Sequence, residues 1–375
     1  MVAAMTGDDT ACGLLAAQHL RAQVAAGVVS ADPRVTADQV QPSSIDLRLG
    51  ATAYRVRASF LPGAGHDVAA RLDAMRMHAL DLTDGAVLER GCVYIVPLME
   101  RLALPPEMTA IANPKSSTGR LDVFARVITD RGLAFDRIRA GYTGPLYAEI
   151  APRSFSVLAR PGDRLVQLRL RSGPRRTSDA ELKDLHADIR LVNPAPADID
   201  IDNGLPVTVD VLGDGPGKVI GYRARKHAGL IDLGKVGHYR MADFWEPLYA
   251  GDTGGLVLDP DDFYILASRE RVKVPETHAA EMVAYDTLIG EFRVHYAGFF
   301  DPGFGDPKSG GEGSRAVLEV RSHEVPFVVD QGQTVGRLVY ERLTAVPDIL
   351  YGSGIGSHYQ RQGLALSKHF ARPGT

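Results

Sequence analysis

At 375 residues the chain is too long for one ordinary domain and suits two domains, each large enough to bury its own core. Apolar residues make up 45% and charged residues 23%, a balance that excludes a disordered chain, and 39 Gly and 23 Pro favour short strands over long helices. The net charge of −4 excludes bulk binding to nucleic acid, although a few local arginines suffice to bind a small polyanion.

The number of cysteines and the lengths of the apolar runs argue against several further classes of protein. Cys12 and Cys92 alone cannot form a disulfide framework or a Cys-rich zinc site. The first residues are acidic, which makes a poor signal peptide, and no apolar run approaches the roughly 18 residues that span a bilayer. We therefore expect a cytoplasmic protein with no membrane partner.

Helical signals are confined to two short segments. They are about residues 13–27 and ELKDLHADIRL at 181–191. The second segment lies between RSGPRR and NPAPAD, a composition typical of a linker. The sequence thus predicts an N-terminal domain at 1–172, a connector at 173–200 and a C-terminal domain at 201–375.

A polar loop, NPKSSTGR at 113–120, carries the first functional signal. It places two cations and three hydroxyls within eight residues, among them Lys115, Ser116, Ser117 and Arg120. Such a cluster can hold a triphosphate through charge-assisted hydrogen bonds and backbone donors. The alternative is an ordinary loop, since Ser, Gly and Lys are common in loops.

The segment FDRIRAGYTGPLYAEI at 135–150 follows. We expect a hairpin with its turn at 140–144, leading into a strand whose alternation brings Glu149 onto a defined face. A carboxylate there can act as the general base of a hydrolytic reaction. The alternative is a glutamate on a strand surface.

An internal repeat has a spacing of 170 residues. YIVPLMERLALP at 94–105 and YILASRERVKVP at 264–275 share five of twelve residues, and the same offset maps Glu149 onto Glu319 and Leu168 onto Leu338. Duplication explains an offset that holds over so long a stretch. We predict a mainly β protein of two tandem β-barrel or sandwich domains with few short helices.

The second copy keeps a different part of the pattern. Asp301 and Phe304 lie in a turn, DPGFG at 301–305, and Glu319 takes the glutamate position. Its polar loop reads YDTLIG at 285–290, where the serine has become aspartate and the arginine glycine. An aspartate repels a triphosphate, so this copy is not expected to form a complete site alone.

The C-terminal tail contains three closely spaced glycines and then Tyr359 and Gln362 in HYQRQG at 358–363. The glycines would let the tail move as a lid, with Arg361 and Lys368 adding positive charge. The alternative is an aromatic-anchored C-terminus that stabilises the barrel.

In order along the chain, QPSSIDLRLG (41–50), KSSTGR (115–120), DRIRAGYTGPLYAEI (136–150) and HYQRQG resemble the signature segments of dCTP deaminases, which share the fold of trimeric dUTPases. The likeness covers most of residues 25–170 and, more loosely, 255–370. The two-copy length resembles a longer bacterial branch of that family. It implies a dUTPase-like fold and dCTP as the substrate.

Residue roles follow from this resemblance. It implies that Ser116 positions the attacking water, that Arg120 belongs to the active site and phosphate region, and that Glu149 is the catalytic glutamate. Lys115 stands where the family often has arginine. Arg137 matches the hairpin arginine, and Tyr142 takes the aromatic position that packs against the deoxyribose.

The resemblance also implies sites built between barrels, and therefore a homo-oligomer with a three-fold arrangement. Two readings compete. Either the N-terminal copies build sites among themselves, which we favour because Ser116, Arg137 and Glu149 lie in one copy, or each site combines Ser116 and Arg120 with Asp301 and Glu319 of the C-terminal copy. The dUTPase aspartate position holds Arg139, which argues against pyrophosphate release by the first copy.

The expected reaction is hydrolysis of dCTP to dUTP and ammonia. Mg²⁺ is expected as the counter-ion of the triphosphate, with no metal bound by the protein and no zinc, since the H-x-E and P-C-x-x-C signature of zinc deaminases is absent. A bifunctional deaminase and dUTPase that uses Asp301 is one alternative. A nucleotide-binding regulatory module without catalysis is another.

Overall fold

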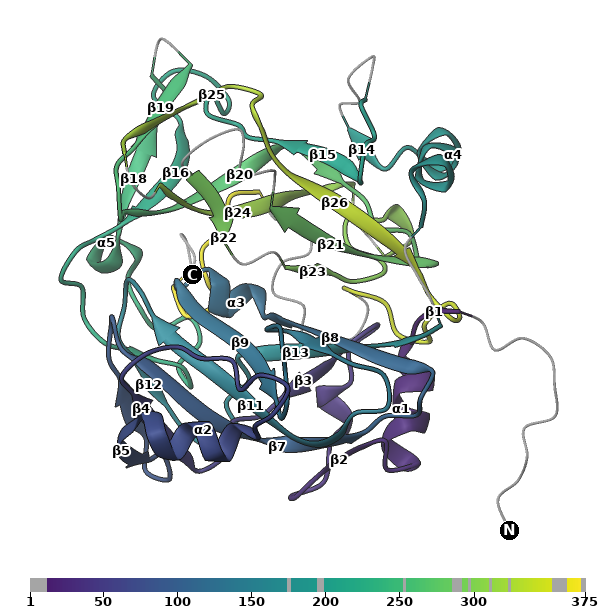
Figure 1. Cartoon of the computed structure of the whole chain (residues 1–375). Coiled ribbons are helices and arrows are strands. Elements are labelled where there is room, and N and C mark those ends of the chain that lie inside the picture. Colours follow the sequence, from purple (N-terminus) through teal and green to yellow (C-terminus); the bar gives the residue numbers. More distant parts are fainter. Residues whose placement is uncertain are drawn as a thin grey trace.

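The chain folds into two β halves that lie one above the other, with the loop 113–120 at their junction (Figure 1). This computed structural model describes residues 12–173, 177–193, 199–251, 254–284, 292–295, 298–309, 312–322, 325–352 and 363–371. It confirms the predicted class, mainly β with few short helices.

Three small sheets build the N-terminal half. The first has the order β1 (Gly13–Leu14), β13 (Val166–Ser172), β8 (Met108–Pro114), β10 (Arg137–Ile138), with β3 (Ile45–Leu47) beside β13. The second has the order β5 (Arg76–Asp81), β4 (Thr52–Val56), β7 (Val93–Ala103), β11 (Thr143–Pro152), β9 (Val123–Thr129), with β2 (Val29–Ala31) beside β7. The third joins β6 (Ala86–Leu88) and β12 (Val157–Ala159) to β17 (Ile231–Asp232) of the other half.

Strand order in the C-terminal half corresponds strand by strand. One sheet runs β15 (Leu205–Thr208), β26 (Thr334–Arg342), β21 (His278–Ala284), β23 (Phe299–Phe300). The other runs β18 (Trp245–Tyr249), β16 (Val219–Ala224), β20 (Phe263–Val272), β24 (Ser314–Ser322), β22 (Phe292–His295), with β14 (Val192–Asn193) beside β20. A pair, β19 (Gly255–Leu258) and β25 (Phe327–Asp330), takes the place of β6 and β12.

The expected hairpin at 135–150 is wrong in its pairing. Its first strand, β10, pairs with β8 in the first sheet, whereas β11 pairs with β7 and β9 in the second. The turn at 140–144 therefore passes from one sheet to the other. As predicted, alternation along β11 places Glu149 on one defined face of its sheet. The residues opposite it on the neighbouring strands belong to β7 and β9 and not to β10.

Helices are short. They are α1 (Ala17–Ala25), α2 (Val68–Met75), α3 (Ser116–Gly119), α4 (Asp179–Ile189) and α5 (Met241–Phe244), with 3₁₀ turns at Ala37–Gln39 and Pro307–Ser309. α4 begins with a capping box in which Ser178 and Glu181 bond to each other's backbone N–H groups. α4 and β14 both lie in the predicted connector, and β14 pairs with β20 of the C-terminal half. The domain limits stay a prediction.

A hydrophobic cluster spans the junction of the two halves, and the C-terminal half has a second cluster of its own. The shared cluster contains most of the buried side chains of the N-terminal half together with Trp245, Phe263, Ile265 and Val317 of the other half. The segment 363–371 packs into the same cluster through Leu366 and Phe370. The junction is therefore a packed interior, and groups placed there are shielded from water.

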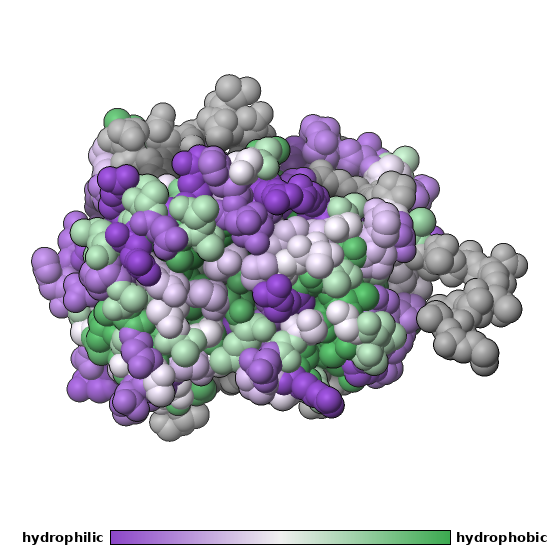
Figure 2. Space-filling view, turned by 60° about the horizontal axis from the view of Figure 1, so that its bottom comes forward, coloured by the Kyte–Doolittle hydropathy of each residue, from purple (hydrophilic) through white to green (hydrophobic). Residues whose placement is uncertain are grey.

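The surface is mixed in polarity. On the face that Figure 2 turns towards the viewer, hydrophobic residues are interspersed with hydrophilic ones. Among the helices that the structure describes, none is long and apolar enough to cross a membrane.

Candidate active site at the junction of the two halves

α3 holds the predicted loop in place between the halves. Lys115 is extended and precedes the helix, and Thr118 donates its hydroxyl hydrogen to the carbonyl of Leu165 at 2.9 Å. Because Ser116 and Arg120 are four residues apart, one helical turn brings them to the same side. Ser117 lies on another side, where its carbonyl accepts a bond from Ser367 at 2.8 Å.

Arg120 points across the junction. Its side chain is almost fully buried, and Nη1 donates to the carbonyl of Ala365 at 3.1 Å. Nε lies 3.8 Å from Oε1 of Glu319, which belongs to the C-terminal half. The structure thus brings together a cation of the first copy and a carboxyl of the second.

Glu319 sits in the middle of β24, opposite Ile265 on β20 and His295 on β22. Burial raises the pKa of this carboxyl to about 8, with Arg120 acting in the opposite direction. A carboxyl with a pKa close to neutrality can both take and return a proton, which is what general acid–base catalysis requires.

A cavity of about 310 Å³ lies beside α3 and gathers positive charge. Its lining includes three cations, Lys115, Arg164 and Lys368, the last from the C-terminal segment. Burial lowers the pKa of Lys368, and the nearby charge of Lys115 acts in the same direction. Like charges held together in this way suit a polyanionic ligand.

Two carboxylates face the same cavity, Asp46 and Asp163. Asp46 forms an ion pair with Lys115, and burial nevertheless raises the pKa of its carboxyl. Its second oxygen, Oδ1, is buried and has no hydrogen-bond partner among the described residues. The cavity therefore offers acceptors as well as cations.

Glu149 lies elsewhere. It occupies β11, and its Oε1 accepts from Arg126 on the neighbouring strand β9, at 2.5 Å from Nη2 and 3.2 Å from Nε. The described contacts of its carboxylate are with Arg126, whereas Arg120 faces Glu319. Within one chain, Glu149 therefore pairs with Arg126 and Arg120 faces Glu319, and a site shared between the N-terminal copies of different chains stays a prediction.

Two other predicted residues, Asp301 and Arg137, lie at other points of the junction. Asp301 accepts bonds from Ser43 at 2.7 Å and from Arg169 at 3.1 Å, so it lies against the N-terminal half. Arg137 lines a separate junction cavity of about 210 Å³ that also contains Arg169 and Glu281.

Two predicted aromatic residues are core side chains. Tyr142 is buried in the N-terminal core and donates its hydroxyl hydrogen to the carbonyl of Pro145 at 2.6 Å. Phe304 packs against Phe300 and Tyr351 in the C-terminal core. Sugar contact by Tyr142 and substrate contact by Phe304 stay predictions.

The tail divides into two parts. Tyr359 and Gln362 lie outside the described residues, as does the loop 285–290. The end of the tail, 363–371, is docked: Lys368 and His369 offer carbonyls to the backbone of Gly237 and of His238. This last part is anchored to the C-terminal half in the structure, and the lid stays a prediction.

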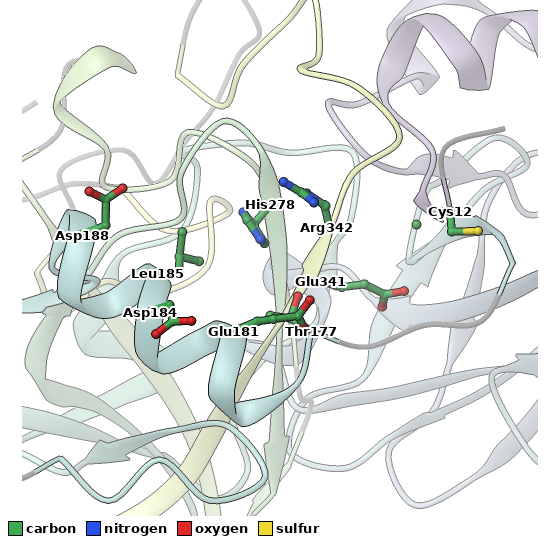
Figure 3. A pocket seen from close by; sticks show the side chains of 10 residues that line it. Cys12, Thr177, Glu181, Asp184, Leu185, Asp188, His278, Glu341 and Arg342 are labelled. Carbon is green, nitrogen blue, oxygen red and sulfur yellow. The ribbon is translucent and has the colours of Figure 1, made fainter. Parts of the chain in front are cut away.

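A larger cavity of about 490 Å³ lies away from α3, between α4 and the end of β26 (Figure 3). Carboxylates of Glu181, Asp184, Asp188 and Glu341 line it together with His278 and Arg342. Among the described residues, no group of three or more His, Cys, Asp or Glu side chains is arranged to hold a metal ion.

Comparison with known proteins agrees with the resemblance. The family model for the N-terminal domain of 2′-deoxycytidine 5′-triphosphate deaminase matches residues 11–174, and the model for the C-terminal domain of the same family matches residues 178–370. The chain belongs to the dCTP deaminase family.

The dCTP deaminases that are similar to this chain differ in sequence identity and in the share of the chain that they match. A crystal structure of 2′-deoxycytidine 5′-triphosphate deaminase from Agrobacterium tumefaciens is 55% identical, with a TM-score of 0.84, and the match covers 88% of this chain and 99% of that one. The "dCTP deaminase, dUMP-forming" of Halobacterium salinarum is 33% identical over 115 residues, 30% of this chain and 54% of the relative. That of Bifidobacterium animalis is 31% identical over 125 residues, 32% of this chain and 61% of the relative. The chain thus spans about half the length of the curated dCTP deaminases that it matches.

Sequence reasoning missed Arg126 and Arg164. Arg126 alternates with apolar residues in VFARVIT, a pattern that identifies a strand but not the neighbour of the guanidinium. Arg164 follows the Pro-Gly-Asp turn at 161–163, where a basic residue ordinarily contacts solvent. The structure lines the α3 cavity with it.

Proposed function

We propose that this protein hydrolyses dCTP to dUTP and ammonia at the junction of its two halves. The observation that carries the proposal is the position of the KSSTGR segment around α3. On one side the segment borders a cavity lined by Lys115, Arg164 and Lys368. On the other side its Arg120 faces the buried carboxyl of Glu319. Three cations suit the triphosphate, and a shielded proton carrier suits the hydrolytic step.

The proposed chemistry is a balanced exchange at C4 of cytosine. A glutamate removes a proton from water, and the water oxygen bonds to C4 while the proton passes to ring nitrogen N3. The remaining hydroxyl proton moves through the same carboxyl to the amino group. The C4–N bond then breaks, ammonia leaves, and a carbonyl remains at C4. Ser116 is proposed to position the water, as the resemblance implies.

Zinc is not part of the proposal, since the sequence lacks the zinc deaminase signature. Mg²⁺ is proposed to enter with the triphosphate, whose charge it neutralises. The partnerless Oδ1 of Asp46 and the carboxylate of Asp163 fit such an ion, because they line the same cavity as the cations and can accept hydrogen bonds from its water ligands.

A second candidate is a bifunctional enzyme that continues to dUMP and pyrophosphate. The names of several relatives, "dCTP deaminase, dUMP-forming", favour it. In this chain Asp301 is the aspartate proposed for that step, although Arg169 and Ser43 already bind its Oδ1. A module that only binds the nucleotide is the third candidate.

One assay separates these functions. The protein is incubated with dCTP and, separately, with dUTP, each with Mg²⁺, and ammonia and pyrophosphate are measured. Ammonia from dCTP without pyrophosphate supports the proposal. Pyrophosphate from either nucleotide supports the bifunctional enzyme, and nucleotide binding without either product supports the regulatory module.

We also infer that the two halves arose by duplication and that the protein self-associates. The matching strand orders and the constant offset of 170 residues between β7 and β20 and between β11 and β24 support the first inference. Val257 and Val328, both about half exposed on the β19–β25 pair, support the second. Light scattering after gel filtration counts the subunits, and a three-fold arrangement of barrels is the expected assembly.

A further inference from the structure

Two glutamates occupy the same position in the two halves. Glu149 lies in β11 and Glu319 in β24, each in the strand beside the longest strand of its sheet, β7 and β20 respectively. Both side chains are nearly fully buried. The two side chains differ in the cation beside them, in the segment of chain that covers their face of the sheet, and in whether they lie next to α3.

An arginine holds the carboxylate of Glu149. Arg126 reaches Oε1 with both Nη2 and Nε, and Nη2 also donates to the hydroxyl of Ser59 at 3.3 Å. Its guanidinium lies 3.6 Å from the ring centroid of Phe135 and 4.8 Å from that of Phe124. The two rings and the hydroxyl thus hold the guanidinium in place against the carboxylate of Glu149.

The chain's own segment 57–75 covers the same face of the sheet. Val68 and Leu72 of α2 pack with Ile95 and Ile128, which lie on β7 and β9, and Phe60 and Phe135 border this cluster. The backbone N–H of Val68 donates to Asp130 at 2.8 Å, which fixes the start of α2 on the sheet. The face that carries Glu149 is therefore closed by local packing, away from α3.

Glu319 has the opposite surroundings. The N-terminal half and the C-terminal segment cover its face, since Ile265 and Val317 belong to the same cluster as Leu366 and Phe370. In the position that Arg126 occupies opposite Glu149, the strand register places His295. Arg120 lies 3.8 Å away, beyond hydrogen-bond distance but close enough to favour the carboxylate once a proton leaves.

We propose that Glu319 is the catalytic carboxyl, that Glu149 is a structural ion-pair residue, and that each chain therefore forms one complete active site. This inference rests on the proposed deamination. A proton carrier must lie beside the groups that act on the substrate, whereas Glu149 lies against Arg126 under α2, away from α3. Arg120 also lies beside Glu319, and Ser116 precedes Arg120 by one turn of α3, so the charged group and the proposed water-positioning residue belong to the element that faces that carboxyl.

Matched glutamine variants test the assignment. Glu319→Gln is expected to lower kcat for ammonia release by roughly 10²- to 10⁴-fold, the usual effect of losing a general base, while the Kd for dCTP changes by less than about ten-fold. Glu149→Gln is expected to keep kcat within a few-fold of the wild type and to lower only the melting temperature. Titration calorimetry of Glu319→Gln with dCTP and Mg²⁺ is expected to give one nucleotide per chain.

A double variant guards against misfolding. Arg126→Gln combined with Glu149→Gln removes both charges together, so no buried charge is left without a partner. It is expected to deaminate dCTP at close to the wild-type rate.

The opposite results would overturn the inference. They are a folded Glu149→Gln variant that has lost deamination, a Glu319→Gln variant that has kept it, or two nucleotides bound per chain. A wild-type protein that binds dCTP but releases no ammonia contradicts the proposed function itself, and with it this assignment. Ammonia release by the wild type therefore distinguishes a failure of the proposed function from a failure of the assignment of Glu319.

Discussion

At the residue scale, two glutamates at matching strand positions differ in their charged neighbour. Glu319 has a pKa of about 8 because it is buried, with Arg120 as its nearby cation. Glu149, of the same type and at the matching strand position, instead binds Arg126. Residue type alone therefore does not tell which glutamate carries protons.

The pH dependence of the reaction follows from Glu319. The carboxylate is the form that takes a proton from water, and burial raises the pKa of this group, so kcat/KM is expected to rise as the pH increases through about 8. Initial rates of ammonia release between pH 6 and 9.5 measure this limb. The Glu149→Gln variant serves as the control and keeps the same limb. A kcat/KM that stays constant between pH 6 and 9.5, as expected for a carboxyl at its ordinary pKa of 4.5, would contradict the assignment.

At the scale of elements, the C-terminal segment 363–371 contacts α3 and the arginine that follows it. The segment supplies a carbonyl to Arg120 and a hydroxyl to the carbonyl of Ser117. Phe370 anchors it among aromatic rings, with its centroid 5.5 Å from that of Phe244 and 5.9 Å from that of Trp245. A segment held in this way positions the arginine before substrate arrives.

Phe370→Ala should therefore affect both stability and activity. Removing a buried phenyl ring costs about 3–5 kcal/mol of unfolding free energy. We also expect a lower kcat/KM for dCTP, because Arg120 loses the carbonyl that orients it. Urea unfolding and steady-state rates measure the two effects. Val236→Ala, at a side chain about half exposed, is the control and should change neither. Unchanged kcat/KM in a destabilised Phe370→Ala protein would show that the segment only stabilises the fold.

At the scale of the whole molecule, the halves are joined by charge as well as by the shared hydrophobic cluster. Arg321 of β24 forms a buried ion pair with Asp122, which follows α3, and also donates to Ser154 at 3.1 Å. Arg169 of β13 bonds the carbonyls of Ala280 and Phe300 at 3.0 Å each. These contacts predict that the halves unfold together.

Arg321→Met tests this coupling. The variant leaves the buried carboxylate of Asp122 without its cation, which costs about 3–5 kcal/mol. Calorimetry is expected to show one transition in the wild type and a single transition at lower temperature in the variant. Asp122→Asn combined with Arg321→Met should recover part of the loss, since no unpaired charge remains. Two separate transitions in the wild type would contradict the coupling.

The sequence by itself determined the mainly β class, the family, and the local grouping of Lys115, Ser116, Ser117 and Arg120. These depend on neighbours in the chain: alternation of period two defines strands, and a loop of eight residues keeps its members together wherever it lies. The repeat likewise predicted that Glu149 and Glu319 are equivalent positions.

Only the tertiary structure decided which glutamate faces Arg120. That outcome depends on strand register, which pairs Glu149 with Arg126, on α2, which closes the face around Glu149, and on the packing of the two halves, which places Glu319 at α3. Each of these contacts joins segments far apart in sequence. No local pattern encodes them, because burial and charge pairing are settled only when the sheets have packed.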